Sequence, residues 1–498
     1  MDFASRSRGS RVVHLGGVRN VNLPSPTESG ARTASPASGI AFLSMEQASV
    51  LIAAGRLSPV ELTEAYLERI SRLDGKLHAF ITVTPETARR EATQAEGDIR
   101  AGRYLGPLHG IPIAHKDIFW TKDVRTTANS RLLRNWIPDV DATVVSRLRE
   151  AGAVCLGKTT LHEFAFGSPG PDEAFPAARN PWHVDYAPGS SSSGSAAAVS
   201  GGLCMAATGS DTGGSIRFPA SVCGAVGMKP TYGCVSTYGA IPLSPSMDHV
   251  GPLTRTVRDN ALMLEAMVGF DPLDACSLRH PSESFQRQIG ADIRGFVVGM
   301  PRRFVESQLH HPEMLKAFER AGQVLEELGA ELLTVDIPEL HGANEAAMTI
   351  IAWEAYRNHA EGLKAHPEMY GATFRERIAF ALGKSEEDYL AAHRKAQALR
   401  AAYGRLFSSS VNVLLTPGGE EPALPMADLL ANPTRRSGAY RMYNLTGIPA
   451  LSMPAGFSHA GFPLGIQIAG PPFGEALIYQ VAAALESALA LNRHPDLE

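Results

Sequence analysis

The stretch YAPGSSSSGSAAAVSGG, residues 186–202, decides how the middle of the chain folds. Its glycine and serine content is typical of a flexible linker, because such residues have little to bury. The residues on its C-terminal side predict something else. SAAAVS is rich in helix formers, Gly201 and Gly202 can end a helix, and LCMAAT has the composition of a buried strand. The stretch therefore predicts a loop and a helix inside an α/β domain.

Helix and strand signals alternate on both sides of this stretch. Two helices open the ordered part of the chain, and the second has Ser58 as the first residue of a capping box. Further on, the helix-like TVVSRLREAG leads into the strand-like AVCLGK, and residues 385–417 repeat that order. The alternation predicts one large α/β domain over residues 41–498, with a helix-rich portion at about residues 300–410.

Composition and charge limit the partners and the compartment. The 498 residues include 46 basic and 51 acidic side chains, a net charge of −5 without blocks of like charge, so nucleic acid is not expected as a partner. The five cysteines form no CxxC pair, which is typical of reduced thiols in the cytoplasm. No apolar run approaches the roughly 18 residues that span a bilayer, so no membrane contact is expected. Residues 1–40 lack periodicity and predict a disordered N-terminal arm, with an Arg/Ser-rich transit peptide as the alternative.

Three familiar functional motifs are not supported by the sequence, because either the pattern or its surroundings do not fit. GAVCLGKT, residues 152–159, fits the phosphate-loop pattern, but a helix precedes it and its strand lies inside the supposed loop, so Gly152 is predicted to end that helix. HEFAF has Phe166 where a metalloprotease HExxH motif needs its second histidine, so His162 is expected to be packed rather than bound to zinc. The GxSxG elbow of serine hydrolases does not occur.

A stronger candidate pairs the glycine-serine stretch with GSDTGGSIRFP, residues 209–219, and with HKD, residues 115–117. A serine hydroxyl is a weak nucleophile and needs a base. Ser215 follows two glycines, whose backbone can turn sharply and aim N–H groups at one point, as an oxyanion hole requires. Taken alone, a glycine-rich turn without chemistry is the simpler interpretation.

Several blocks of the sequence, in order, resemble the amidase signature family. They are GIPIAHKD, GAVCLGKTTLHEFAFG, ARNPW, GSSSSGSAAAVSGG with GSDTGGSIRFPASVCGAVGMKPTYG, DHVGPLTRTVRDNA, and YNLTGIPALSMPAGF with PLGIQIAG. The resemblance covers nearly everything from about residue 44 onward. It implies the fold of that family, a single large α/β domain whose mixed central β-sheet is flanked by helices on both faces.

The resemblance also implies a serine-serine-lysine triad. Ser215 matches the nucleophile, Lys116 the base, and Ser191 the bridging serine, which the family holds through a cis peptide bond. The other implied site residues are the oxyanion-hole amides of Thr212, Gly213, Gly214 and Ser215 and the supporting side chains of Ser192, Asp211 and Arg217.

Two further features bear on this triad. A lysine accepts a proton at neutral pH only if its pKa falls from about 10.4 to near 7, and the apolar residues around Lys116, such as Ile113 and Phe119, predict the burial that would lower it. Ser190 and Ser193 stand where the family usually has glycines. These serines are expected to change the fine geometry of the site and to leave activity in place.

The expected function is hydrolysis by water of the C–N bond of a small-molecule carboxamide, through a seryl acyl-enzyme, with no metal and no cofactor. Aryl amides, carbamates and ureas stay open as substrates, and a homodimer is allowed. One alternative is the glutaminase subunit of a tRNA-dependent amidotransferase. It ranks lower because IIAWEAYRNHAEGLKAHPEMYG does not resemble the corresponding segment there. The alternative of another class is a non-catalytic ligand-binding protein on the same fold.

Overall fold

The computed structural model describes residues 36–279, 284–308, 310–432 and 441–498. Most of the predicted N-terminal arm, residues 1–35, lies outside the described residues. Its last five residues belong to the first helix, α1 (Pro36–Ala41). No helix in the described ranges is both long and apolar enough to cross a lipid bilayer.

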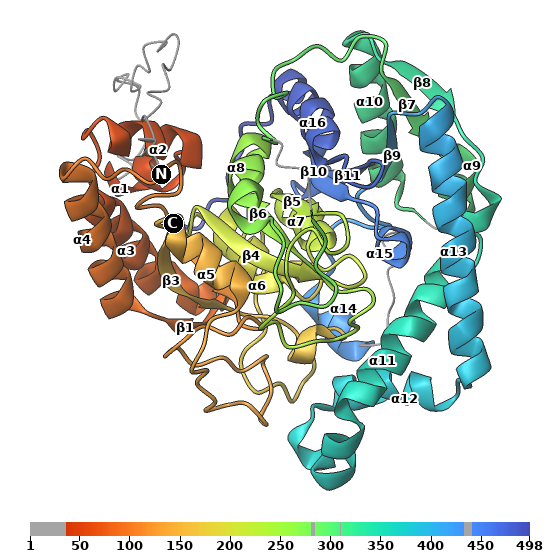
Figure 1. The fold of residues 1–498 in the computed structure, drawn as a ribbon, viewed down its shortest axis with the longest axis horizontal. Helices are drawn as coiled ribbons and strands as arrows, with labels where there is room; N and C mark the ends of the chain where they lie inside the picture. Colours follow the sequence, from red (N-terminus) through yellow and green to blue (C-terminus); the bar gives the residue numbers. More distant parts are fainter. Residues whose placement is uncertain (1–35, 280–283, 309, 433–440) are drawn as a thin grey trace, which may run out of the picture.

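One 11-stranded sheet forms the centre of the molecule, in the order β1-β3-β2-β4-β6-β5-β10-β11-β9-β7-β8 (Figure 1). β2 is parallel to β3 and β4, and β7 is parallel to β8 and β9, whereas the other pairs are antiparallel. The predicted mixed sheet is therefore confirmed. The strands are β1 (Phe80–Val83), β2 (Pro112–Lys116), β3 (Val154–Thr159), β4 (Ala206–Asp211), β5 (Val226–Lys229), β6 (His249–Thr254), β7 (Val297–Met300), β8 (Glu331–Thr334), β9 (Val413–Pro417), β10 (Ala450–Phe457) and β11 (Pro463–Ala469).

Helices cover both faces of this sheet, as predicted. Adjacent residues of a strand point to opposite faces. In β11, Leu464 packs against Met314 on one face, while Gly465 lies directly under Ser221 on the other. The remaining helices include the long α11 and α13, which pack side by side (Figure 1). The helices are α2 (Met45–Ala53), α3 (Pro59–Leu77), α4 (Pro85–Arg100), α5 (Thr143–Glu150), α6 (Ser193–Ser200), α7 (Arg217–Cys223), α8 (Val257–Met267), α9 (Arg302–Ser307), α10 (Pro312–Glu327), α11 (Ala343–Ala365), α12 (Ala372–Leu382), α13 (Glu386–Ser409), α14 (Met426–Ala431), α15 (Arg441–Thr446) and α16 (Glu475–Leu489).

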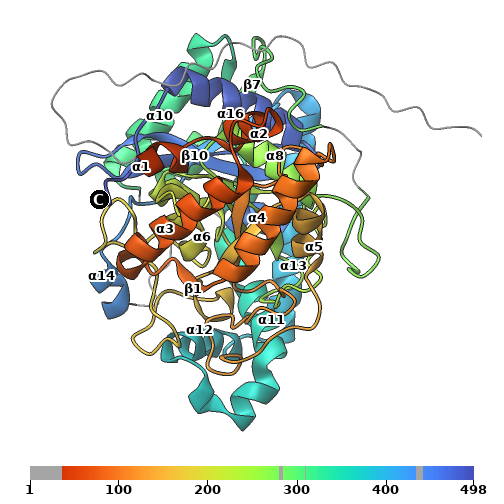
Figure 2. The ribbon, with the colours of Figure 1, turned by 90° about the vertical axis from the view of Figure 1, so that its left-hand side faces the viewer.

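The start of α3 follows from local sequence. The Ser58 hydroxyl accepts from the Glu61 amide, and the Glu61 carboxylate accepts from the Ser58 amide, so the predicted capping box is confirmed. Two backbone N–H groups that a helix start leaves unsatisfied are paired in this way. The apolar side of α3 is then buried, and α3 and α4 lie side by side over the N-terminal part of the sheet (Figure 2).

The glycine-serine stretch is buried and ordered, so the linker interpretation is wrong. Its second half forms α6, which is capped by Gly201, and the chain then continues into β4, as predicted. Gly194 shows why a small residue is needed inside it, because a Cβ there would lie 2.4 Å from the Thr160 nitrogen. Close packing therefore holds the start of α6 against the chain that leaves β3.

Candidate active site

Lys116 is the last residue of β2, and its side chain is completely buried. Its Nζ lies 2.8 Å from Ser191 Oγ, 3.0 Å from Ser192 Oγ and 2.9 Å from Ser210 Oγ. Within the described part of the chain, no carboxylate forms an ion pair with this nitrogen. Three hydroxyl oxygens therefore surround Nζ in place of a counter-charge.

This environment changes the proton affinity of the amine. Burial lowers the pKa of Lys116 to about 7, against a smaller opposing effect of the Asp211 and Asp248 carboxylates. The shift arises because an ammonium ion loses its hydration inside the protein and gains no adjacent anion. Neutral and charged forms are both populated near pH 7, so the amine can accept and return a proton.

The start of α6 presents the two serines to Lys116. The hydroxyl of Ser192 donates to the carbonyl of Ser210 at 3.1 Å, and its amide donates to the carbonyl of Ser215 at 3.2 Å. Before it, Gly189 has a φ of +101°, and a Cβ at that position would lie 2.7 Å from Pro219 Cα. The backbone of this loop is thus fixed against both β4 and α7.

The loop after β4 carries Ser215, which is partly exposed, unlike Lys116 and Ser191. A buried pair of Asp211 and Arg217 holds the two ends of this loop together, with 3.0 Å from Nε to Oδ2 and 3.1 Å from Nη2 to Oδ1. Burial alone would raise the pKa of Asp211, but the charge and hydrogen bonds of Arg217 hold it well below its usual range. The carboxylate is thus an anion, and a fixed acceptor at the base of the loop.

The amide groups of the loop do not all point the same way. Gly214 N–H donates to Asp211 Oδ1 at 2.7 Å, so the structure directs it away from a substrate oxygen. Within the described residues, the amides of Thr212, Gly213 and Ser215 have no hydrogen-bond acceptor. Three of the four expected oxyanion-hole donors are therefore available.

The link between the two serines of the expected triad is open in this structure. Among the described residues, no hydrogen bond joins the hydroxyls of Ser191 and Ser215. No cis peptide bond occurs there either, so the cis bond expected before Ser191 is wrong. In ligand-free enzymes, catalytic hydrogen bonds are often long, and they shorten when the substrate binds.

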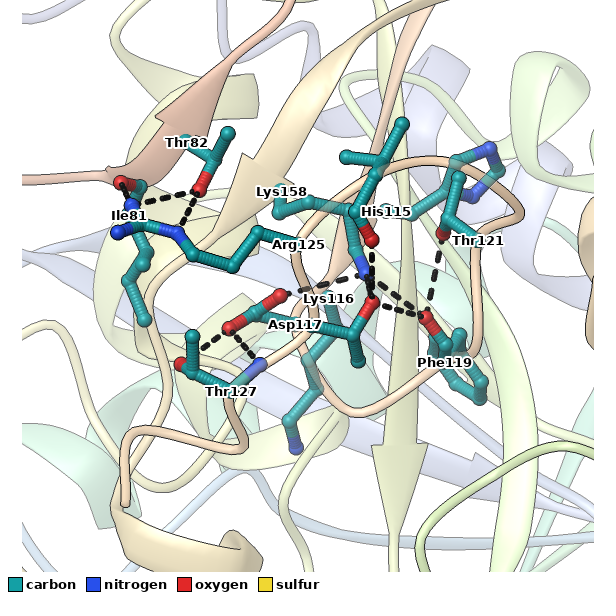
Figure 3. A network of polar contacts seen from close by, with 12 residues as sticks. Ile81, Thr82, His115, Lys116, Asp117, Phe119, Thr121, Arg125, Thr127 and Lys158 are labelled. Atoms are coloured by element: carbon teal, nitrogen blue, oxygen red, sulfur yellow. Dashed lines mark hydrogen bonds and ion pairs between the residues drawn. The ribbon is translucent and has the colours of Figure 1, made fainter. Parts of the chain in front are cut away.

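The lysine of the phosphate-loop-like motif has a structural partner. Lys158 Nζ lies 3.2 Å from Asp117 Oδ1 and donates to the Phe119 carbonyl and to Thr126 Oγ1. Both charged side chains are fully buried, and the side chain of Lys116 extends away from them (Figure 3). Gly152 follows Ala151, the residue that caps α5, and has a φ of +85°, as predicted for a glycine that ends a helix. The motif thus forms a strand and a buried ion pair.

A pocket of about 130 Å³ opens onto Ser215. Apolar side chains such as Phe166 and Met348 share its wall with charged ones. His162 also lines it, and its Nδ1–H donates to the Gly167 carbonyl at 2.8 Å, so this histidine is packed, as expected. The charged lining residues are Arg377, Arg441, Glu420 and Glu421.

The two serines that replace family glycines differ in their surroundings. Ser190 lines the pocket, and its hydroxyl donates weakly to the Gly214 carbonyl at 3.4 Å. The Ser193 hydroxyl is buried in the first turn of α6 and has no hydrogen-bond partner among the described residues. Ser190 can therefore touch a bound substrate, whereas Ser193 is buried in the helix start, away from the pocket lining.

Sequence reasoning missed two hydroxyls that hold Lys116. Thr208 Oγ1 accepts from the backbone amide of Lys116 at 3.1 Å, and Ser210 Oγ lies beside its Nζ. Both residues belong to β4 and stand two positions apart, so they share one face of that strand. This spacing in ATGSD was the available signal, and it needed the pairing of β2 with β4 to become useful.

The chain matches the family model described as Amidase over residues 61–479. It is 41% identical over 461 residues, 87% of this chain and 94% of the relative, to a glutamyl-tRNA(Gln) amidotransferase subunit from Geobacter metallireducens. Among solved structures, the glutamyl-tRNA(Gln) amidotransferase subunit from Thermotoga maritima has a TM-score of 0.77 and 32% identity, over 92% of this chain and 98% of that chain. The native peptide amidase of Stenotrophomonas maltophilia has a TM-score of 0.80 and 30% identity, over 92% of this chain and 99% of that chain.

These similarities correct the expected function. A stand-alone amidase for a small-molecule carboxamide was expected, but relatives about 40% identical over most of the chain are named as subunits of an amidotransferase. The expectation placed too much weight on the segment at residues 350–371. Residues 356–369 of that segment are exposed or half-buried apart from His359, so packing constrains their sequence little.

The expectation about partners is corrected as well. We expected no nucleic acid among the partners and a small-molecule substrate. Both expectations disagree with relatives that are named as subunits of a glutamyl-tRNA(Gln) amidotransferase. A net charge of −5 describes only the surface of this chain. It does not report on an assembly in which another protein contacts the nucleic acid. The family match and the structural similarity nevertheless agree on the chemistry: the chain belongs to the amidase family, and it is an amide-hydrolysing enzyme.

Proposed function

We propose that this chain is the glutaminase subunit of a tRNA-dependent amidotransferase. The observation that carries the proposal is the 41% identity to a glutamyl-tRNA(Gln) amidotransferase subunit, which extends over 94% of that relative. In this role the chain hydrolyses the side-chain amide of glutamine, and the ammonia passes to a partner subunit that amidates glutamyl-tRNA(Gln).

In the proposed first half-reaction, Ser215 Oγ attacks the amide carbonyl carbon of glutamine. Its proton moves to Ser191 Oγ while Ser191 gives its own proton to neutral Lys116, whose Nζ lies 2.8 Å from the Ser191 oxygen. The amides of Thr212, Gly213 and Ser215 stabilise the oxyanion of the tetrahedral intermediate. When the C–N bond breaks, the proton returns from Lys116 through Ser191 to the nitrogen, and ammonia leaves.

The second half-reaction is hydrolysis of the glutamyl ester on Ser215. Water attacks the ester carbonyl, and its proton follows the same path to Lys116. The tetrahedral intermediate then releases glutamate, and Ser215 regains its proton. The steps balance with glutamine and water as the only reactants, because each proton that Lys116 takes up is returned within the same half-reaction.

The charges of the pocket support an amino acid as substrate. Arg377 and Arg441 contribute positive charge to its wall, and Glu420 and Glu421 contribute negative charge. Glutamine carries a carboxylate and an ammonium group at one end and a neutral amide at the other. Both signs of charge near a partly exposed serine suit such a zwitterion better than an apolar amide.

The test is an assay of the chain with and without the other subunits of an amidotransferase. We expect glutamine hydrolysis to rise when partner subunits and glutamyl-tRNA(Gln) are added, and we expect nitrogen from amide-labelled glutamine to appear in glutaminyl-tRNA. Ser215→Ala should abolish the transfer from glutamine while free ammonia still supports amidation by the assembly. Glutamine-dependent transfer by Ser215→Ala at the wild-type rate would refute the assignment.

A further inference from the structure

Asp248 joins the loop that follows β4 to a second segment of the pocket wall. Its Oδ1 accepts the hydroxyl of Thr212 at 2.5 Å. Its Oδ2 accepts the backbone amides of Leu243 at 2.9 Å and Ser244 at 3.0 Å. Thr212 and Leu243 both line the pocket, whereas Asp248 itself does not. One carboxylate therefore ties two separate segments of the pocket wall together.

The hydroxyl of Thr212 matters because of where its backbone lies. Thr212 is the first residue after β4, and its amide is one of the three that remain available to a substrate oxygen. A hydrogen bond of 2.5 Å to a carboxylate fixes the side-chain rotamer. Fixing the rotamer also limits rotation of the backbone at the start of the loop, where the amide direction is set.

The segment that carries Asp248 is itself held from the helical layer. Glu354 of α11 accepts the hydroxyl of Ser244 at 2.7 Å and that of Ser246 at 2.6 Å. It also accepts the hydroxyl of Tyr389 from α13 at 2.8 Å. Asp248 is thus attached to a braced segment and not to a freely moving turn.

We propose that Asp248 is a positioning residue that, through the hydroxyl of Thr212, holds the oxyanion-hole amides in register with Ser215. The proposal rests on the proposed acyl-transfer role of Ser215. It assigns to Asp248 no contact with substrate and no proton transfer. Its contribution is the placement of Thr212, and a displacement of about 1 Å at such a site costs about 100-fold in rate.

The test measures the rate at which a fluorophosphonate labels Ser215 in the full chain. This probe places a phosphoryl oxygen where the oxyanion forms, and it does not depend on the identity of the amide substrate. Thr212→Val removes the hydroxyl and keeps the shape and the backbone amide. We expect Thr212→Val and Asp248→Ala each to slow labelling about 10- to 100-fold. The double variant should be no more than about twofold slower than Asp248→Ala, because both changes break one connection.

Two further variants separate positioning from other effects. Asp248→Asn keeps one oxygen that can accept from the two backbone amides, and its side-chain N–H can donate to the hydroxyl oxygen of Thr212, so it should label within a few-fold of the wild type. Thr143→Val removes an equivalent contact, a Thr hydroxyl 2.5 Å from the carboxylate of Asp271 on a segment outside the pocket lining, and should label at the wild-type rate. Melting temperatures of all variants show whether any slow labelling reflects unfolding.

The results distinguish this proposal from the proposed function. Wild-type labelling by Thr212→Val, or effects of Thr212→Val and Asp248→Ala that multiply, would overturn the positioning role alone. Labelling by Asp248→Asn as slow as that by Asp248→Ala would also overturn it, because charge rather than placement would then matter. A wild-type chain that resists the probe would refute the nucleophile assignment of Ser215, and both proposals with it.

Discussion

The Nζ atom of Lys116 lies 2.8 Å from the hydroxyl oxygen of Ser191 in a completely buried site. Neither residue reaches the pocket, whereas Ser215 lines it and is partly exposed. In the proposed mechanism, the amine therefore acts on a substrate only through hydroxyl groups. That mechanism makes the activity depend on the charge of Lys116.

The pH dependence of glutaminase activity should follow this charge. Because burial lowers the pKa of Lys116 to about 7, the neutral amine dominates above that pH and the ammonium form below it. We expect kcat/KM to rise with pH through about 7 and to fall roughly tenfold per pH unit well below it. Rates measured between pH 5.5 and 9 check this, with circular dichroism at each pH to show that the protein stays folded. A flat profile across pH 7 would contradict the assigned base.

Lys116 should also lower the stability of the protein at acidic pH. Its pKa is about 7 in the folded chain and about 10.5 when unfolded, so between these values the unfolded chain binds the extra proton. The free energy of unfolding of the wild type therefore decreases as pH falls from 10.5 to 7, and the full loss is present below 7. Lys116→Met lacks this effect. The melting temperature of Lys116→Met minus that of the wild type should be larger at pH 6.5 than at pH 9, and an equal difference at both would contradict the shifted pKa.

The two buried hydroxyls of α6 should respond in opposite ways to removal. Ser193 Oγ has no hydrogen-bond partner in the described part of the chain, so Ser193→Ala should raise the free energy of unfolding by about 1 kcal/mol. Ser195 Oγ bonds Thr159 Oγ1 at 2.7 Å and the Thr208 carbonyl at 2.9 Å. Ser195→Ala should lower that free energy by about 1 to 3 kcal/mol. Urea denaturation measures both, and equal losses in the two variants would show that Ser193 is paired in solution.

Removing one partner of the buried ion pair between Lys158 and Asp117 should lower the free energy of unfolding. Lys158→Met leaves the Asp117 carboxylate without its counter-charge and should destabilise the fold by about 3 to 5 kcal/mol. The double variant Asp117→Asn with Lys158→Met should recover much of that loss. Arg303→Met, which breaks an exposed pair with Asp336, should show no measurable loss in the same urea titration. A Lys158→Met variant as stable as Arg303→Met would show that the buried pair contributes little.

Local signals in the sequence predicted much of the fold. Ser58 and Pro59 indicated the start of α3, and the helix formers between Ser193 and Ser200 indicated α6, because capping and propensity act over a few residues. The pairing of β10 with β5 and β11 was not predicted. These strands are largely buried on both faces, so no alternation of polar and apolar residues reveals their partners.

From the sequence, only those residues of the candidate site that stand in a recognisable motif could be predicted. Lys116, Ser191 and Ser215 stand in motifs that the resemblance identified. Ser210 reaches Lys116 through the parallel pairing of β4 with β2, and Asp248 reaches Thr212 through the antiparallel pairing of β4 with β6. Sequence spacing specifies neither pairing. The direction of the Gly214 amide was not visible either, because it depends on which loop amides the Asp211 carboxylate captures.

The most direct test of the account is to trap the covalent intermediate on Ser215. The wild-type chain is mixed with glutamine, quenched in acid within the first turnovers and digested for mass spectrometry. The account predicts that the peptide containing Ser215 gains the mass of a glutamyl group and loses it on treatment with hydroxylamine, while Ser215→Ala shows no gain. Glutamine hydrolysis with no adduct on that peptide, or with an adduct on another residue, would contradict it.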